Sequence, residues 1–216
     1  MTSEVMFRLG IPALDEYVGA IKPGYLILVE GEVETYPYLV LHRIGFSAAR
    51  DYGYKVLYIV VNDDPEEYLE ASINVGLDIR TLIYRKLWRY LKAESFEDVV
   101  KVIVEEVSRS LVLVDASLAK IRLNYNEVMF VKNTLKNNES VLALTISPSI
   151  VPKEEVMMIE KVANIVLRLS FDVVSGEPRY FMKLIKYKNM PKKALMLPYS
   201  IGALGIRIER LQKIPS

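Results

Sequence analysis

The chain has 216 residues, a net charge of +1, no cysteine and a single histidine. The lack of cysteine excludes disulfides, thiol catalysis and thiolate metal sites, and the balanced charge gives no general attraction to nucleic acid. No run approaches the roughly 18 consecutive apolar residues of a membrane-spanning helix, and the first residues carry no signal-peptide pattern. We therefore expect one domain over residues 1–216, in the cytoplasm and without membrane contact.

Charge is distributed unevenly along the chain. Residues 151–216 hold twelve Lys and Arg against six Asp and Glu, whereas residues 1–150 hold sixteen against twenty-one. Two interpretations stay open: chance clustering on a soluble surface, or a basic patch that binds an acidic partner or the acidic part of a second copy. A single glutamine and no cysteine favour a thermophilic source.

Strand and helix signals alternate through the first 150 residues. Four apolar runs, typical of strands covered by helices on both faces, span residues 25–29, 55–61, 111–114 and 141–146. Helix patterns span residues 38–52, 65–75, 95–109 and 125–138. Ser95 and Asn124 are the expected caps of the last two helices. A further short strand is expected over residues 82–87.

The pattern changes after a helix expected over residues 152–163. Three strands follow without intervening helices, over residues 165–171, 180–187 and 206–210. Ser175 and Gly176 supply the tight turn of a hairpin between the first two. The sequence therefore predicts an α/β fold with a mostly parallel sheet, flanked by helices and extended by antiparallel C-terminal strands.

The segment after the first strand occupies the place of a phosphate-binding loop. A strand, a tight turn and a helix N-terminus are the setting of the motif G-x-x-x-x-G-K-[ST], in which backbone N–H groups and a lysine hold phosphates. Gly31 matches the first glycine. Tyr36 replaces the second glycine, Pro37 replaces the lysine, and Tyr38 replaces the hydroxyl residue that holds Mg²⁺. The motif is degenerate.

These replacements oppose phosphate binding. Proline has no N–H to donate, and we expect Tyr36 to resist the positive φ that glycine supplies. Three nearby carboxylates lie where a polyanion would sit: Glu30, Glu32 and Glu34. We expect a closed turn in which Tyr36 or Tyr38 fills the space of the phosphates. Pro37 also has a purely structural interpretation, because proline is favoured at the first position of a helix.

Several short motifs, in the right order, resemble the KaiC-like branch of the RecA-like ATPases, which is common in archaea. Residues 10–17 (GIPALDEY) resemble the opening G-I-P-G-L-D-E-L, and residues 21–32 (IKPGYLILVEGE) are similar to the approach to the phosphate-binding loop. Later landmarks are matched by residues 55–58 (KVLY), 64–68 (DPEEY), 186–189 (KYKN) and 205–206 (GI). The resemblance covers nearly the whole chain and implies a RecA-like fold.

The resemblance also assigns roles outside the turn. Asp115, which ends a buried strand, matches the aspartate that helps to hold Mg²⁺ in the family; since the hydroxyl residue is replaced, a cap of the following turn is the favoured interpretation. Asn62 and Asp63 stand where the family has two glutamates that activate water, and an amide cannot take a proton. Lys186 and Lys188 match positions that reach a neighbouring subunit's nucleotide, with an exposed charged strand as the equal alternative.

Together these observations predict a non-catalytic KaiC/RecA-like protein, a pseudo-ATPase that acts as an interaction or regulatory subunit, without catalytic residues, metal or cofactor. The expected partner is a protein, either a second copy or an active RecA/KaiC-like paralogue, packed head to tail. Two alternatives stay open. One is a nucleotide-dependent enzyme with an altered site built from Asp115, Asp63 and a neighbour's Lys186. The other is a DNA-associated accessory protein that meets phosphates through its basic C-terminal third.

Overall fold

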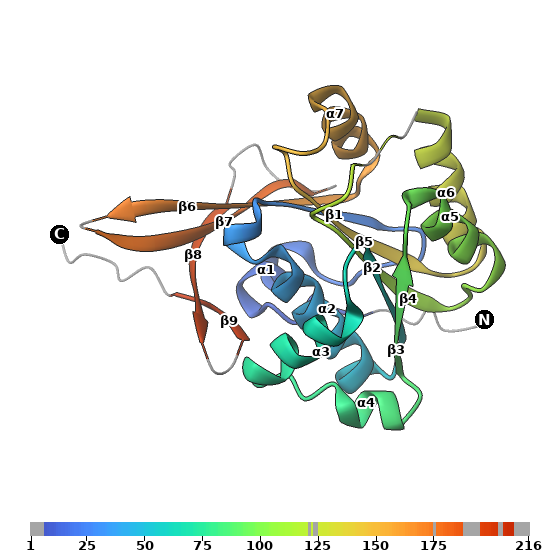
Figure 1. Cartoon of the computed structure of the whole chain (residues 1–216), viewed down its shortest axis with the longest axis horizontal. Coiled ribbons are helices and arrows are strands. Elements are labelled where there is room, and N and C mark those ends of the chain that lie inside the picture. Colours follow the sequence, from blue (N-terminus) through green and yellow to red (C-terminus); the bar gives the residue numbers. More distant parts are fainter. Residues whose placement is uncertain are drawn as a thin grey trace.

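The architecture is that of a mixed sheet with helices packed on both faces (Figure 1). It is seen in a computed structural model that describes residues 7–120, 122, 125–174, 176–187, 195–202 and 205–209. The expected cap Asn124, the hairpin residue Ser175 and Lys188 lie outside these residues.

The described residues form a nine-stranded sheet. The strands are β1 (Leu26–Glu30), β2 (Lys55–Val61), β3 (Trp88–Ala93), β4 (Ser110–Ala116), β5 (Val141–Ile146), β6 (Ile165–Val174), β7 (Glu177–Tyr187), β8 (Leu195–Gly202) and β9 (Gly205–Ile208). Their order across the sheet is β3-β2-β4-β5-β1-β6-β7-β8-β9. Pairing is parallel from β3 to β6 and antiparallel from β6 to β9, which confirms the predicted fold class.

Two layers of helices bury the sheet. They are α1 (Pro12–Val18), the short 3₁₀-helix η1 (Val33–Thr35), α2 (Pro37–Tyr52), α3 (Pro65–Asn74), α4 (Arg80–Tyr84), α5 (Phe96–Glu105), α6 (Tyr125–Asn137) and α7 (Lys153–Val162). One face packs against α1 to α4 and the other against α5 to α7 (Figure 1). Because side chains alternate along a strand, Ile27 and Val29 of β1 enter the first layer while Leu26 and Leu28 enter the second.

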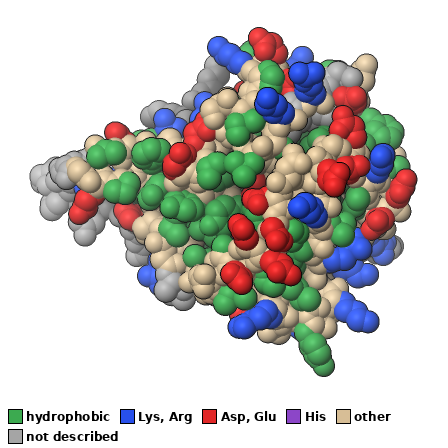
Figure 2. All heavy atoms as spheres, in the orientation of Figure 1, with side chains coloured by type: hydrophobic (Ala, Val, Ile, Leu, Met, Phe, Trp, Pro, Cys, Tyr) green, Lys and Arg blue, Asp and Glu red, His purple; other side chains and the backbone are tan. Residues whose placement is uncertain are grey.

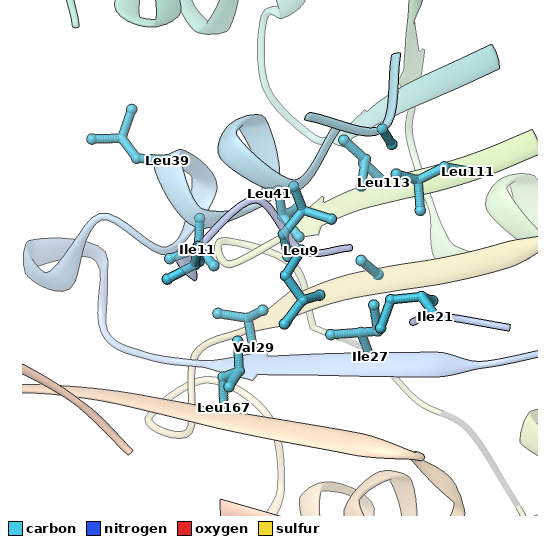
Figure 3. Close-up of a cluster of buried hydrophobic side chains, with 14 of the residues drawn as sticks. Leu9, Ile11, Ile21, Ile27, Val29, Leu39, Leu41, Leu111, Leu113 and Leu167 are labelled. Carbon is cyan, nitrogen blue, oxygen red and sulfur yellow. The ribbon is translucent and has the colours of Figure 1, made fainter. Parts of the chain in front are cut away.

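The first layer fixes the start of α2. Leu39 and Leu41 of this helix are buried in the same apolar cluster as Val29 of β1 and Leu113 of β4 (Figure 3). Each of these side chains is at most 2% exposed. Burying one such side chain stabilises the fold by about 1.5–3 kcal/mol. The turn that joins β1 to α2 therefore connects two rigid elements.

The prediction of a strand over residues 82–87 is wrong. Residues 80–84 form α4, and the strand is β3, which lies at the edge of the sheet. Its Arg89 and Lys92 are exposed, so the continuous apolar run of a buried strand is missing. β8 and α1 have no counterpart among the expected elements. Pro198 interrupts the strand pattern of β8, which lies near the antiparallel edge of the sheet.

The boundaries of the expected helices agree with the structure to within one residue, except at the C-terminal end of α5. Ser95 caps α5 as expected: its hydroxyl oxygen accepts the Asp98 N–H at 3.2 Å, and the hydroxyl donates to the Asp98 carboxylate at 2.8 Å. The helix ends at Glu105 rather than near Arg109. Arg109 has a φ of 49°, which is incompatible with a continuing helix.

Candidate functional site at the ends of β1 and β4

Backbone hydrogen bonds within the turn and to the end of β5 hold the turn between β1 and α2. The N–H groups of Gly31, Thr35 and Tyr36 donate to carbonyl oxygens of the protein at 3.1, 2.9 and 3.0 Å. Pro37, the first residue of α2, has no N–H. A phosphate-binding loop leaves such groups directed at the ligand. Here three of them already have acceptors, in agreement with the expected closed turn.

Tyr36 adopts a left-handed backbone conformation, with φ 53° and ψ 52°. The expectation that tyrosine would resist a positive φ is therefore wrong, although the conformation costs roughly 1–2 kcal/mol for a residue with a Cβ. Its ring packs edge-on against Tyr38 and Tyr180, with centroids 6.3 and 6.2 Å away. Contacts with neighbouring rings, together with the tight turn, hold a geometry that is usual for glycine.

Glu32 ties the turn to the loop after β5. Its carboxylate accepts hydrogen bonds from the Ser147 hydroxyl and from both the hydroxyl and the N–H of Ser149, the latter two at 2.6 and 3.1 Å. Charge-assisted bonds of this kind are stronger than neutral ones. Glu32 is thus a structural clamp rather than a free negative charge at the phosphate position, which corrects the expectation from sequence.

Glu30 ends β1 in a fully buried position. Its carboxylate pairs with Arg168 of β6 at 2.7 Å, and Arg168 also contacts Glu160 of α7 at 2.7 Å. Burial raises the pKa of Glu30 from 4.5 to about 7; Arg168 opposes this shift and Glu160 adds to it. Glu30 therefore supports the end of the strand and is not part of an exposed acidic ring.

Asp115 lies at the end of β4 and is only 2% exposed. Its Oδ1 accepts the Ser117 N–H and the Thr145 hydroxyl, each at 3.0 Å, so the expected turn-capping role is present. Its Oδ2 is buried and has no hydrogen-bond partner among the described residues. Burial raises the pKa of Asp115; the bonds from Ser117 and Thr145 oppose this shift, and nearby Asp63 adds to it.

The two positions after β2 do not carry the pair of glutamates that activates water in the family. Asn62 is exposed, has a φ of 61° and donates its N–H to Ala93 at 2.9 Å. Asp63 accepts the Asp64 N–H at 2.9 Å and the Tyr68 hydroxyl at 3.1 Å. Asp63 is therefore held by the start of α3, while the Asn62 amide has no proton-accepting function.

The structure brings four of the predicted site residues to one small cavity of about 220 Å³. They are Pro37, Tyr38, Asp63 and Asp115. Val33, Glu67, Tyr68, Ala71, Ser117 and Leu118 complete the wall. Gly31 and Tyr36 shape the adjoining turn, whereas Asn62 lines a separate surface hollow beside the start of α5.

A cluster of aromatic rings supports this cavity, and sequence reasoning missed it. The fully buried His42 places its Nδ1 2.8 Å from the Tyr38 carbonyl and its Nε2 2.9 Å from the Tyr90 hydroxyl. The rings of Tyr58 and Tyr68 both pack against this imidazole, and they also pack against each other. Burial lowers the pKa of His42 to about 4. The available signal was the Tyr38–His42 spacing of one helical turn, combined with Tyr58 in β2 and the alternating Trp88 and Tyr90 of β3.

A larger groove of about 1130 Å³ runs beside the turn, between α3 and the C-terminal strands. Tyr36, Tyr180 and Tyr199 contribute rings to it. The Tyr199 hydroxyl of β8 donates to the Thr35 carbonyl at 2.8 Å, so the C-terminal strands are tied directly to η1. Tyr38 and Ala71 line both this groove and the smaller cavity.

Lys186 has a contact within its own chain. Its ammonium group donates to the carbonyl oxygens of Glu160 and Lys161 at 2.9 and 2.7 Å. These carbonyls belong to the last turn of α7. Carbonyl oxygens in the last turn of a helix have no N–H donor within the helix. Lys186 thus caps a helix, and its contact with a neighbouring subunit stays a prediction.

A comparison with protein-family models and with curated proteins finds no match to this sequence. Solved structures do match. The flagellar accessory protein FlaH from Methanocaldococcus jannaschii has a TM-score of 0.75 at 17% identity, over 96% of this chain and 100% of its own. A KaiC-like protein from Pyrococcus horikoshii has a TM-score of 0.78 at 16% identity, over 95% and 99%. This chain has a RecA-like fold.

Within this RecA-like fold, the turn after β1 does not fit the phosphates of a nucleotide in the manner of the complete motif. The N–H groups of Gly31, Thr35 and Tyr36 are bonded to the protein, Pro37 has no N–H, and no lysine side chain is present in the turn. Among the described residues, no group of three or more His, Cys, Asp or Glu could hold a metal ion. No helix in the same part of the chain is long and apolar enough to cross a membrane.

Proposed function

We propose that this RecA-like chain is a non-catalytic protein, a pseudo-ATPase, which acts in the cytoplasm as an interaction or regulatory subunit. The observation that carries the proposal is the closed turn between β1 and α2. Hydrolysis in a phosphate-binding loop needs free N–H donors and a cation that stabilises the transferred phosphoryl group. In the Tyr36–Pro37–Tyr38 segment the Tyr36 N–H is bonded to the protein, Pro37 has no N–H, and no side chain is a cation.

The remaining polar groups support the same proposal. The Ser or Thr with which the motif's aspartate shares Mg²⁺ is missing, because Tyr38 occupies that position. Asp63 accepts two hydrogen bonds from α3 and its flanking turn. Its carboxylate is therefore engaged with the protein, and the glutamate pair that activates water in the family is missing. A general base must lie within hydrogen-bonding reach of the proton that it removes.

We further propose that the partner is a second copy or an active RecA/KaiC-like paralogue, packed head to tail. Figure 2 shows acidic side chains gathered over α3. Asp64, Glu66, Glu67 and Glu70 are exposed there. β7 carries Lys183 and Lys186, of which Lys186 also caps α7. Opposed charges of this kind give orientation and a faster association rate, and they weaken with salt over about 8–10 Å.

Calorimetric titration of the chain with ATP and Mg²⁺ tests the loss of nucleotide binding. We expect no heat of binding at millimolar nucleotide and no rise in melting temperature, since a ligand of the folded state stabilises it by mass action. ADP and inorganic phosphate serve as matched controls for non-specific anion effects. A rise that is specific to ATP would contradict the proposal and would favour the alternative of an enzyme with an altered site.

Light scattering across a salt series tests the partner. We expect assemblies at low salt that dissociate as salt is added, either of this chain alone or with an active paralogue from the same host. A charge-reversed variant of Glu66 and Glu70 should stay monomeric, while reversal of Glu105, an acidic residue on the far layer, should have no effect. A monomer under all conditions, even beside the paralogue, would refute the interaction.

A further inference from the structure

The small cavity beside Asp115 has the wrong charge for an anion. Its wall carries three carboxylates, Asp63, Glu67 and Asp115, and no Lys or Arg among its lining residues. Its volume of about 220 Å³ corresponds to roughly seven water molecules at ~30 Å³ each. This is below the range of about 300–1,000 Å³ that is typical of small-molecule sites. A nucleotide is too large, whereas the end of one long side chain fits.

One atom in the wall is incompletely bonded. Asp115 Oδ2 is buried and has no partner among the described residues, although Oδ1 of the same carboxylate accepts two hydrogen bonds. Buried polar atoms in folded proteins nearly always have a partner, and one left without a partner is costly. Because Asp115 lines the cavity, a cation placed inside it would lie beside this incompletely bonded carboxylate and compensate its charge.

The remaining wall favours an organic cation over a bare metal ion. Tyr38 and Tyr68 stand edge to face with ring centroids 5.4 Å apart, and both line the cavity. Aromatic faces attract ammonium and guanidinium groups. The described residues offer no cluster of three or more metal-ligating side chains here. The wall therefore suits an organic cation: its N–H groups can donate to the carboxylates, and its apolar stem can pack against the tyrosine rings.

We propose that this cavity binds the ammonium or guanidinium end of one Lys- or Arg-sized organic cation, with the buried Asp115 carboxylate as its counter-charge. The inference rests on the proposed function, because a bound nucleotide with its Mg²⁺ would compete with the cation for Asp115. The chemistry is shared by two sources: a side chain of a protein partner and a free amine. Tyr38 and Ala71 also line the large groove, so a peptide lying in that groove can place one side chain in the cavity.

Titration of the full chain with butylguanidinium and with butylurea, followed by amide resonances in NMR spectra, tests the site. The two probes have nearly the same shape and differ in charge. We expect saturable, salt-sensitive shifts at Ala71, Ser117 and Leu118 with butylguanidinium only. Equal shifts with both probes, or none with either, would overturn the proposal.

Asp115→Asn is the decisive variant. Asparagine keeps an acceptor oxygen for Ser117 and Thr145, so the fold is retained, but it removes the negative charge at Oδ2. We expect the affinity for butylguanidinium to fall about tenfold or more. Glu16→Gln, on the exposed surface of α1, makes the same change in net charge and should leave the affinity unchanged. Equal affinity in Asp115→Asn and the parent would refute the assignment.

Two further arms identify the source and separate this proposal from the proposed function. Tighter binding of an acetylated Ala-Arg-Ala amide than of butylguanidinium assigns the site to a protein side chain, and tighter binding of spermidine assigns it to a free amine. ATP is titrated into the same samples. ATP binding with cation binding refutes the pseudo-ATPase and keeps the cation site; neither binding refutes only the cation site.

Discussion

β1 and β4 lie on either side of β5, yet the polar groups at their ends differ in how they are bonded. After β1, Glu30 pairs with Arg168 and Glu32 is clamped by two serines, and three N–H groups of the turn are bonded. Glu30 Oε1 and Asp115 Oδ2 are both buried without a hydrogen-bond partner among the described residues. The other oxygen of Glu30 is paired with a cation, whereas the other oxygen of Asp115 accepts only from neutral donors. Among the described residues, the charge of the first carboxylate is therefore compensated and that of the second is not.

This contrast has an energetic consequence. Removing one member of a satisfied buried pair leaves the other member uncompensated and destabilises the fold. Removing the charge from an unsatisfied group relieves a cost that is already present. Substitutions after β1 should therefore lower the free energy of unfolding, whereas a neutral substitution of Asp115 should not.

The largest effect is expected for Arg168→Met. It leaves the buried Glu30 without its cation, and we expect the free energy of unfolding to fall by about 3 kcal/mol, the lower end of the range for a broken buried pair because Glu30 can take up a proton. Urea denaturation measures the change. Lys55→Met, at an exposed strand residue, is the matched control. In the background of Glu30→Gln, Arg168→Met should cost far less; equal costs in both backgrounds would contradict the pairing.

The pH dependence of stability separates Glu30 from His42. The pKa of Glu30 is raised from 4.5 to about 7 by folding, so the folded state holds the extra proton and the contribution of Glu30 is lost as pH rises through that range. The pKa of His42 is lowered from 6.5 to about 4, so its contribution is lost as pH falls through that range. Each shift corresponds to about 3 kcal/mol at most, and in the parent the two oppose each other.

Single variants should expose each component. Relative to the parent, Glu30→Gln should gain stability with rising pH between about 4.5 and 7, and His42→Gln should lose stability with rising pH between about 4 and 6.5. Urea midpoints at a series of pH values measure both, and each variant controls for the other. Curves that stay parallel to that of the parent would show that neither shift exists.

A smaller effect is expected at the clamp on Glu32. Ser147→Ala combined with Ser149→Ala removes both hydroxyl donors, and we expect a loss of about 1–2 kcal/mol, since water replaces part of the bonding at this half-buried carboxylate. Ser108→Ala, at an exposed loop residue, should be neutral. A double-mutant cycle with Glu32→Gln measures the coupling. Additive effects would show that the clamp contributes nothing.

The sequence predicted most of the fold because its buried strands are continuous apolar runs. Residues 55–61 and 141–146 match β2 and β5 residue for residue. β3 escaped prediction because an edge strand carries exposed Arg89 and Lys92, which break that pattern. Local signals therefore sufficed for elements buried on both faces and failed at the margins of the sheet.

The site was predictable in part. The turn after β1 and Asp115 follow from position along the chain, because the ends of parallel strands meet at one edge of a sheet. The partner of Glu30 lies 138 positions away along the chain, and the partners of Glu32 lie 115 and 117 positions away. No local sequence pattern predicts such contacts. The unpartnered oxygen of Asp115 is likewise a property of packing in three dimensions, as is the aromatic cluster around His42.

The smallest effect, and the only one of opposite sign, is expected for Asp115→Asn without any ligand. The variant keeps the Oδ1 acceptor for Ser117 and Thr145 and removes a charge that burial disfavours. We expect the free energy of unfolding to stay equal or rise by up to ~1 kcal/mol. Asp115→Ala, which also removes Oδ1, should be destabilised instead because two buried donors lose their acceptor. If Asp115→Asn were destabilised as strongly as Asp115→Ala, Oδ2 would have a partner inside the folded chain, and the contrast between the two strand ends would disappear.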